Sequence, residues 1–365
     1  MFPAKKAEER IKQLCCLGLG GEVIMPTLLK EMHSLIPSYS NLFHWADEYC
    51  QATNLCFEDP INVEIGPLYF SEFYQKRESE VILTFPETVR RYRGVATLQH
   101  LVKGSLKEFY KHDYYNLIFR PINAYHCLYS ILYESDRPVG MVVLGRAEHD
   151  PPFSQQEHKR LEWITPYITH GLASAQGLQT EWVDGEEAGL IIMDKRGRLV
   201  HLSERGRKLL FLASYPKISP LTVNPKHQDF ATPTRLAQLC TNLIAVFEGR
   251  SSALPPVWHH QNSWGKFCFR AYWLDKTDPA NSSAIGITIT HQIPLPVKLV
   301  QLQEQLSLSQ RQLDLCLLLV SGLSYPKIGK QLGHTEISVV SQSKRIYHTH
   351  GTRTREDFIA KLRSL

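Results

Sequence analysis

The sequence lacks a long apolar run. No stretch approaches the roughly 18 consecutive apolar residues that a membrane-spanning helix requires, and the opening residues, MFPAKKAEER, lack the apolar core of a signal peptide. We therefore expect a soluble cytoplasmic protein with no membrane partner.

Cysteine motifs are also missing. The eight cysteines form no C-x-x-C pair and no His/Cys cluster with metal-ligand spacing. We expect reduced, mostly structural thiols and no metal site. The adjacent pair Cys15 and Cys16 leaves a redox sensor open as an alternative.

No familiar catalytic pattern is present. The sequence has no P-loop, no G-x-S-x-G, no H-E-x-x-H and no paired Ser/His/Asp arrangement. It also lacks the aspartate cluster of a phosphorelay receiver. An enzyme is therefore not expected, and no residue is proposed as catalytic.

Positive charge is concentrated at the C-terminal end. From Lys298 onward there are 10 lysines and arginines against 5 aspartates and glutamates, whereas the preceding 297 residues hold 31 of each. Binding to nucleic-acid phosphates requires such a local excess. The neutral remainder, too long for one ordinary domain, is expected to do something else.

The basic region reads as four short helices. Ser309, Ser324, Thr335 and Thr354 are suited to cap them, and Gly322 can take the left-handed conformation that ends the first. Apolar residues at three-and-four spacing predict one shared core: Leu315, Leu318, Leu319, Ile328, Leu332, Val339 and Ile346. This pattern is typical of a helix-turn-helix domain.

The segment resembles the DNA-binding domain of LuxR-type transcription regulators. The positions that match without a gap are Leu308, Arg311, Gly322, Ser324, Ile328, Leu332, Gly333, Val339, Ile346, Tyr347, Gly351, Arg353 and Arg355. The resemblance implies an all-α tetrahelical domain that binds double-stranded DNA. Helix-turn-helix proteins commonly bind two half-sites as two-fold dimers, so we expect a homodimer.

The resemblance also implies roles for individual side chains. Val340, Ser341 and Lys344 occupy the base-reading positions, where Lys344 can donate to guanine and Val340 can pack on a thymine methyl. The implied phosphate contacts are Lys327, Ser338, Gln342, Arg345 and Arg353.

Four positions depart from the LuxR pattern. Lys327 replaces an acidic residue, Val340 a lysine, Gln342 a histidine and Ser343 an apolar residue. We expect the tail to have its own DNA sequence preference. The alternative is a decayed, non-DNA-binding domain in an interaction module that sequesters another regulator.

The first part of the chain carries a predicted β-hairpin, 125–133 and 139–145, followed by a long helix. Ser154 and Glu157 have capping-box spacing ahead of that helix. This region resembles the end of a GAF domain, a small-molecule sensor with a central antiparallel sheet. The resemblance rests on Gly140, Leu144, Arg146, Pro152, Phe153, Ser154 and Glu157. It leaves the effector and any cofactor unknown.

A further, weaker resemblance concerns a possible lactone-binding site. Trp45, Tyr49 and Asp59 loosely resemble the residues with which LuxR-type quorum sensors hold an acyl-homoserine lactone. The spacing is one residue too long, so we expect ordinary core and surface positions.

The middle of the chain predicts a strand, turn and strand over 188–203 and a following helix. It resembles the opening of a PAS domain through Gly189, Asp194 and Gly197, with Ser203 where asparagine is commonest. Segments 266–274 and 284–290 fit its closing strands, whereas 214–264 is Pro-rich and is expected to be irregular. His201, His259 and His260 are ordinary histidines in this interpretation rather than haem ligands.

A helix is also expected at 297–306, with Leu299, Leu302 and Leu306 on one side. It is interpreted either as a linker packed on its own domain or as a dimer seam. The predicted class is multidomain α+β. The expected boundaries are a GAF-like domain at 1–180, a PAS-like domain at 181–293, a linker at 294–307 and the helix-turn-helix domain at 308–365. Together these features predict a transcription regulator controlled by a small-molecule or protein signal.

Overall fold

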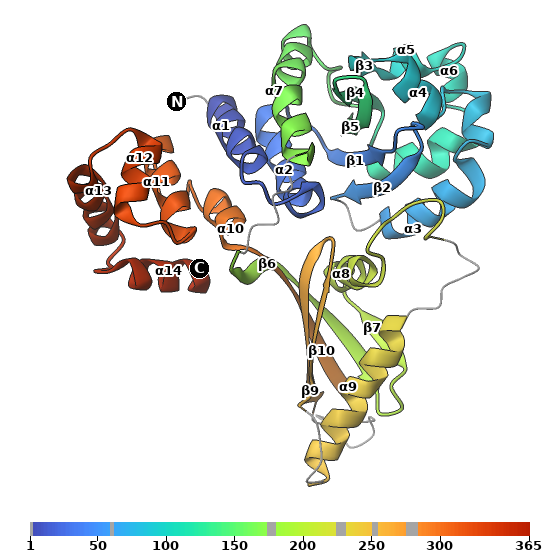
Figure 1. The fold of residues 1–365 in the computed structure, drawn as a ribbon. Coiled ribbons are helices and arrows are strands. Elements are labelled where there is room, and N and C mark those ends of the chain that lie inside the picture. Colours follow the sequence, from blue (N-terminus) through green and yellow to red (C-terminus); the bar gives the residue numbers. More distant parts are fainter. Residues whose placement is uncertain (1–2, 59–61, 174–179, 224–230, 250–254, 275–283) are drawn as a thin grey trace.

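The computed structural model describes residues 3–58, 62–173, 180–223, 231–249, 255–274 and 284–365. These residues form an α+β protein with two five-stranded antiparallel sheets and a helical C-terminal region. Figure 1 shows the two sheets one above the other, with the C-terminal helices beside them. The predicted α+β class is confirmed at this level.

The first domain is built on a sheet with strand order β2-β1-β5-β4-β3. The strands are β1 (Ser40–Ala46), β2 (Ala52–Phe57), β3 (Gly94–Thr97), β4 (His126–Glu134) and β5 (Arg137–Arg146). The predicted hairpin is the β4–β5 pair. Strands β1 and β2, which were not predicted, complete the sheet on the other side of β5.

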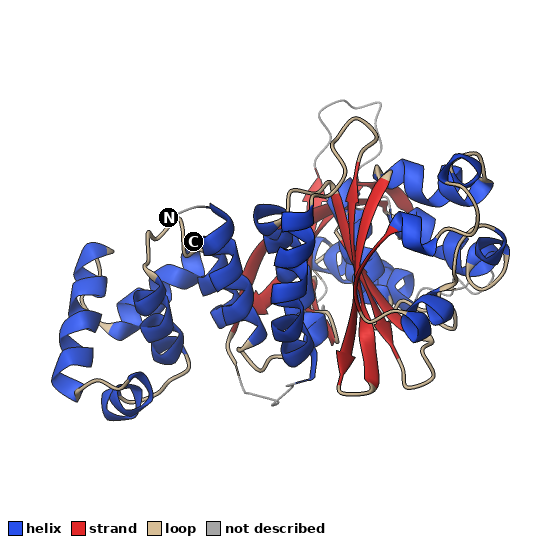
Figure 2. Ribbon diagram, turned by 90° about the horizontal axis from the view of Figure 1, so that it is seen from above, coloured by secondary structure: helices blue, strands red, loops and turns tan. Residues whose placement is uncertain are grey.

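Helices cover both faces of this sheet, as Figure 2 shows. One face packs against α2 (Gly21–Leu35) and α7 (Gln155–Ala173), and α1 (Pro3–Cys15) packs on these two helices. The other carries short helices and turns: α3 (Asn62–Leu68), η1 (Tyr69–Phe73), η2 (Arg77–Glu80), α4 (Phe85–Arg91), α5 (Leu98–Leu101), α6 (Leu106–Phe109), η3 (Tyr115–Phe119) and η4 (Arg120–Ile122). Side chains alternate between these layers along each strand. Ser130 of β4, for example, hydrogen-bonds Thr165 of α7 over 2.7 Å.

Four of the residues behind the GAF resemblance, Arg146, Phe153, Ser154 and Glu157, meet in one cluster that joins β5 to α7. Ser154 and Glu157 form the predicted capping box, and Arg146 pairs with the same Glu157 carboxylate. The Arg146 guanidinium also lies 4.1 Å from the centre of the Phe153 ring. Burial opposes ionisation of Glu157, but the bonds from Arg146 and Ser154 outweigh it and lower the pKa of this carboxyl.

Replacing Glu157 with glutamine is expected to destabilise the protein by about 3 kcal/mol at pH 7, because the buried Arg146 loses its partner. The carboxylate has a lowered folded pKa, so its contribution is present above the unfolded value of about 4.3 and disappears as the pH falls through the folded value. Denaturant unfolding of both proteins between pH 7 and pH 3 measures the difference. A gap that stays constant over this range would contradict the assignment.

The second domain has strand order β7-β6-β10-β9-β8. Its elements are β6 (Trp182–Asp194), β7 (Leu199–Leu202), α8 (Glu204–Ser214), α9 (Ala231–Phe247), β8 (Val257–Asn262), β9 (Gly265–Leu274) and β10 (Ala284–Pro294). The predicted turn is confirmed, with Gly197 at φ +74°. Ser203 is the N-cap of α8, and its hydroxyl accepts the Gly206 N–H.

The expectation that 214–264 is irregular was wrong. The segment contains α9 and β8. Leu236, Leu239 and Leu243 are buried and recur at three-and-four spacing, which is the signature of a helix face. The high proline content of the surrounding sequence hid this signal.

The C-terminal region contains α10 (Leu295–Gln301), α11 (Gln310–Val320), α12 (Tyr325–Leu332), α13 (Glu336–Thr349) and α14 (Arg355–Ser364). Ser309, Thr335 and Thr354 each accept a backbone N–H as predicted. Ser324 occupies the cap position of α12 without a side-chain hydrogen bond. Gly322 and Gly333 have φ of +79° and +66°, which explains why glycine ends these helices.

The segment expected as a helix over 297–306 is shorter and more deeply buried than predicted. Helix α10 ends at Gln301, and all of its residues from Leu295 to Val300 are buried. Leu299, Leu302 and Leu306 are also buried, in a core that includes Leu14 of α1 and residues of α11–α14. These three leucines therefore do not form an exposed dimer seam.

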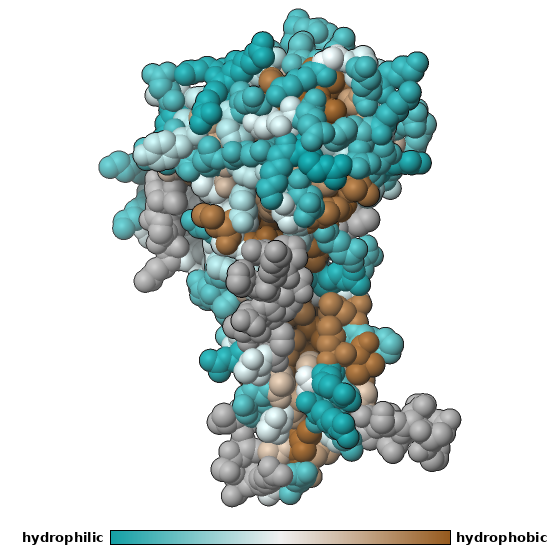
Figure 3. Space-filling view, turned by 90° about the vertical axis from the view of Figure 1, so that its right-hand side faces the viewer, coloured by the Kyte–Doolittle hydropathy of each residue, from teal (hydrophilic) through white to brown (hydrophobic). Residues whose placement is uncertain are grey.

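The two sheet domains differ in surface character. The second exposes several large apolar side chains: Leu190, Leu199, Val200, Val246, Phe247, Tyr272 and Leu274. In Figure 3 hydrophobic surface is seen over this lower domain, whereas the visible face of the first is mainly hydrophilic. Among the described helices, none combines the length and apolar character needed to cross a bilayer.

Candidate DNA-binding surface and buried cavity

Helix α13 presents one face to the domain core and the opposite face to solvent. Val339, Ser343, Ile346 and Tyr347 are buried against α11, α12 and α14. In Figure 1 α13 lies at the outer edge of the molecule, away from both sheets. No described part of the chain covers its outward face in this view.

The predicted base-reading residues lie on or beside that outward face. Ser341 and Lys344 are exposed and Val340 is half-buried. Ser341 and Lys344 also line a shallow hollow together with Arg345, His348 and Thr349. The structure therefore places these three predicted residues within little more than one turn of a single helix.

The predicted phosphate-contacting residues fall into two groups. Lys327, Arg345 and Arg353 are exposed, so their charges are accessible. Ser338 and Gln342 are half-buried and bonded to each other, with the Gln342 Nε2 donating to the Ser338 Oγ over 3.1 Å. This bond orients both side chains and reduces their freedom to bind elsewhere.

Two residues on the outward face were missed by sequence reasoning. Ile337 is 82% exposed, and His348 is exposed one turn beyond Lys344. Both could have been found from their spacing, since residues 337, 341, 344 and 348 share one face of an α-helix. An apolar side chain this exposed at the start of α13 is suited to contact a thymine methyl.

Ser343, which replaces an apolar residue of the LuxR pattern, lies in the core of the helical region and not on its surface. Its side chain is fully buried, and its hydroxyl donates to the Val339 carbonyl over 2.8 Å. Ser343 therefore affects the packing of α13. The expectation that it changes the DNA sequence preference directly was wrong, because its side chain does not reach the surface.

Arg355 has a structural role. Its guanidinium donates to the Leu323 carbonyl over 2.9 Å and to the Leu319 carbonyl, so it ties the start of α14 to the end of α11 and the following turn. Arg353, two residues earlier, is exposed.

Replacing Arg355 with alanine is expected to lower the free energy of unfolding by about 2 kcal/mol, because two carbonyls lose a charged donor. Arg353→Ala is the matched control and is expected to change it by less than about 0.5 kcal/mol. Denaturant unfolding of each variant measures both values. Equal losses would show that the Arg355 contacts contribute little.

The first domain contains a cavity of about 100 Å³ between its sheet and the layer of short helices. Leu42, Leu55, Met141 and Val143 line it from the sheet, and Ile65 of α3 lines it from the opposite layer. No lysine or arginine is present among the described residues that line it.

Several polar side chains interrupt this apolar lining, among them His44, Glu78, Tyr114 and Tyr129. The His44 Nδ1 is buried and has no hydrogen-bond partner among the described residues. Glu78 is 1% exposed and accepts the Gln75 N–H over 2.8 Å and the Tyr114 hydroxyl over 3.2 Å. Burial lowers the pKa of His44 to about 4 and raises the pKa of Glu78 to about 7.

The residues that loosely resemble a lactone site are not brought together. Trp45 contacts Phe43 on the other face of the sheet, with ring centres 4.7 Å apart, and faces Trp264 of the second domain at 6.0 Å. Tyr49 is 68% exposed. Asp59 lies outside the described residues. The expectation of ordinary core and surface roles holds for the first two.

The histidines of the second domain do not converge either. His201 and His259 are exposed, and His260 stacks near Trp258 with ring centres 5.3 Å apart. His291 is buried, and its Nε2 donates to the Trp264 carbonyl over 2.9 Å. Burial lowers the pKa of His291.

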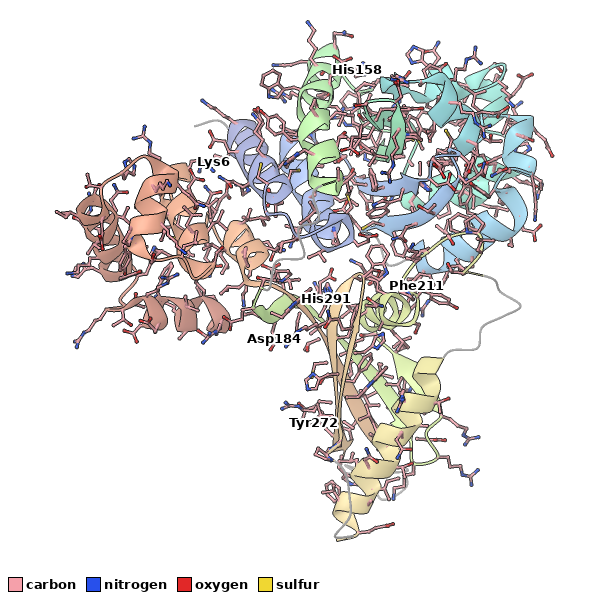
Figure 4. The ribbon with its side chains drawn as sticks, viewed as in Figure 1. Lys6, His158, Asp184, Phe211, Tyr272 and His291 are labelled. Atoms are coloured by element: carbon pink, nitrogen blue, oxygen red, sulfur yellow. The ribbon has the colours of Figure 1, made fainter. Side chains whose placement is uncertain are left out.

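The three parts of the chain meet around α10. Figure 4 shows Asp184, His291 and Phe211 at the end of the second domain that faces the other two parts. The buried Lys298 amine donates to the Asp184 carbonyl over 3.0 Å and to the Arg363 carbonyl of α14 over 3.3 Å. Phe211 of α8 packs on Phe57 of the first domain, with ring centres 6.1 Å apart.

Polar contacts also join the first domain to the C-terminal region. Arg10 of α1, itself paired with Glu31, binds Glu304 over 2.8 Å. The Gln301 amide donates to the Thr27 hydroxyl over 2.9 Å, and Gln13 donates to Asp314. The C-terminal helices are therefore held against α1 and α2.

The double variant Gln301→Ala/Glu304→Ala is expected to loosen this contact, because two polar bonds across it are removed. Hydrogen exchange of the α10 amides is expected to accelerate about tenfold, in line with about 1.4 kcal/mol. Glu186→Ala is the control, since its pair with Lys30 is exposed on both sides and contributes little. Unchanged exchange in the double variant would show that the apolar core alone holds α10.

Comparisons with known proteins add little to this description. No known protein family matches the sequence, and neither does any curated protein. A solved structure described as the sensor region of a sensor histidine kinase aligns with 44% of this chain and 62% of its own length, at 10% identity and a TM-score of 0.19. The alignment spans less than two thirds of that protein, and its TM-score is too low to support an argument about function.

Proposed function

We propose that this protein is a DNA-binding transcription regulator whose two sheet domains receive a signal. Small-molecule binding in the first domain is the proposed input, and α13 is the proposed DNA-contacting helix. The protein would act as a homodimer, because two-fold dimers suit paired DNA half-sites.

The observation that carries this proposal is the outward face of α13. Ser341, Lys344 and Arg345 are exposed on a helix whose other face is fixed by buried residues. That helix belongs to the region that holds the whole positive excess of the chain. An accessible, basic, rigid helix is what insertion into a major groove requires.

The buried position of α10 supports the proposed control by a signal. Its core contains residues from α1, β6 and the C-terminal helices, so a displacement of either sheet domain acts on the C-terminal region directly. A ligand shifts such an arrangement only by the difference between its affinities for the two arrangements.

Binding of the full-length protein to random-sequence duplex DNA is expected to weaken steeply as salt rises. Lys344→Ala/Arg345→Ala is expected to reduce affinity about tenfold or more at low salt and to lower the salt slope by about 1 to 2. Lys159→Ala/Arg160→Ala on α7 is the matched control, since it removes the same two charges from the first domain. Fluorescence anisotropy over a salt series measures both, and sedimentation in the same buffer is expected to give a dimer.

Absence of binding at low salt by the folded wild-type protein would overturn the proposal. It would favour an interaction module that sequesters another regulator. Equal losses in the two double variants would show that binding is driven by net charge and that α13 is not the contact surface. A monomer at working concentrations would contradict the proposed dimer.

A further inference from the structure

The outward face of α13 carries an apolar side chain in its first turn and basic side chains further along. We propose that Ile337 contacts the methyl group of a thymine and Lys344 contacts a guanine, with the two bases about two to three base pairs apart in each half-site. This inference rests on the proposed DNA-binding function and deepens it by naming a contacting residue, two bases and their spacing. The resemblance to LuxR-type domains supplies neither Ile337 nor this spacing.

The position of Ile337 is what distinguishes it. Its side chain is 82% exposed, compared with 44% for Leu365, the other large apolar side chain exposed in the C-terminal region. A single exposed apolar residue is ordinary on a protein surface. Ile337, however, lies one turn before Ser341 and two turns before Lys344, and residues at this spacing share one face of an α-helix. It therefore stands in line with the predicted base-reading residues.

The major groove of DNA offers a matching partner. Its base edges present hydrogen-bond donors and acceptors, which an isoleucine side chain cannot use, and one apolar group, the methyl of thymine. Val340 follows Ile337 by three residues and is half-buried, so the apolar surface continues into the next turn. A thymine methyl that packs on Ile337 removes apolar surface from water on both molecules, which favours binding.

Lys344 sets the other end of the contact. It is exposed, and its amine can donate to the O6 and N7 atoms of guanine. Positions 337 and 344 lie about 10 Å apart along the axis, because an α-helix rises about 1.5 Å per residue. Stacked base pairs are about 3.4 Å apart, so a helix that follows the groove meets bases about two to three base pairs apart at these two positions.

The first turn of α13 is held in place without DNA. The Thr335 hydroxyl accepts the Ser338 N–H over 3.2 Å, and the next residue, Val339, is buried in the core. Isoleucine is also β-branched, so in a helix its side chain keeps one strongly preferred rotamer. A contact residue that is fixed before binding loses less entropy when the complex forms.

The test uses the full-length protein and a duplex that it selects from random-sequence DNA. Each thymine of the selected half-site is replaced in turn by deoxyuridine, which removes the methyl group and leaves the base pairing unchanged. One replacement is expected to weaken wild-type binding about threefold to tenfold in fluorescence anisotropy. 5-Methylcytosine carries the same methyl on a different hydrogen-bonding edge, so at that position it is expected to bind more tightly than cytosine and more weakly than thymine.

Three variants assign the contacts to residues. Ile337→Ala is expected to bind the thymine and deoxyuridine duplexes equally, because the side chain that contacts the methyl is gone. Lys344→Ala is expected to lose the preference for guanine over adenine while it keeps the preference for thymine over deoxyuridine. Leu221→Ala is the matched control for loss of an exposed apolar side chain, since Leu221 is 94% exposed in the second domain and its loss should change neither preference.

The spacing is tested separately. One base pair inserted between the thymine and the guanine is expected to weaken wild-type binding as much as the loss of either base. Equal wild-type affinity for the thymine and deoxyuridine duplexes, or an unchanged preference in Ile337→Ala, would contradict the methyl contact. A selected half-site with no thymine and guanine at the expected distance would contradict the spacing. Each of these results leaves DNA binding itself in place, whereas absence of binding in the salt series would remove both proposals.

Discussion

The arrangement of this molecule depends on the burial of α10. A seven-residue helix is too short to be stable alone, and here its residues from Leu295 to Val300 are all buried. Its neighbours come from every part of the chain: Leu14 and Ile24 from the first domain, Val183 from the second, and the C-terminal helices. Through this one core, the first domain, the second domain and the C-terminal helices pack directly against one another.

Lys298 adds hydrogen bonds of defined geometry to that core. Burying an amine is costly unless its hydrogens are used. The amine here reaches carbonyls on β6 and α14, so it is satisfied only when the second domain and the C-terminal region are both in place. Contacts of this kind have a defined geometry, whereas apolar packing tolerates sliding. A signal that moves either part must break or re-form these bonds, which is a physical basis for switching between discrete arrangements.

The cavity of the first domain and the outward face of α13 lie on opposite sides of the core around α10. The cavity lies on the sheet face opposite α2 and α7, and α1 and α2 are the helices of that opposite layer that touch the C-terminal region. The sheet stands between them, and β1 and β5 contribute residues to both sides. A change in the cavity therefore reaches α10 through one sheet and one helical layer. The outward face of α13 is left free of these contacts, as a DNA-binding role requires.

Elements that are specified by a few neighbouring residues could be predicted from the pattern of residues alone. Capping residues such as Ser309, Thr335 and Thr354, the glycines at 322 and 333, and the alternating strands of the β4–β5 hairpin act over a few residues, so their positions followed from spacing alone. The division of α13 into a buried and an exposed face also follows from residue spacing within the helix. Helix α9 was missed because its proline-rich setting outweighed a correct apolar spacing at Leu236, Leu239 and Leu243.

Contacts between elements that are far apart in the chain could not be predicted in this way. The pairing of β1 with β5, and with it the wall of the cavity, joins residues about a hundred positions apart, and no local pattern specifies such pairing. The meeting of His44, Glu78 and Tyr129 around one space depends on that sheet. In the same way, Leu299, Leu302 and Leu306 have the spacing of an exposed seam, and only the position of α1 and α2 shows that they are core.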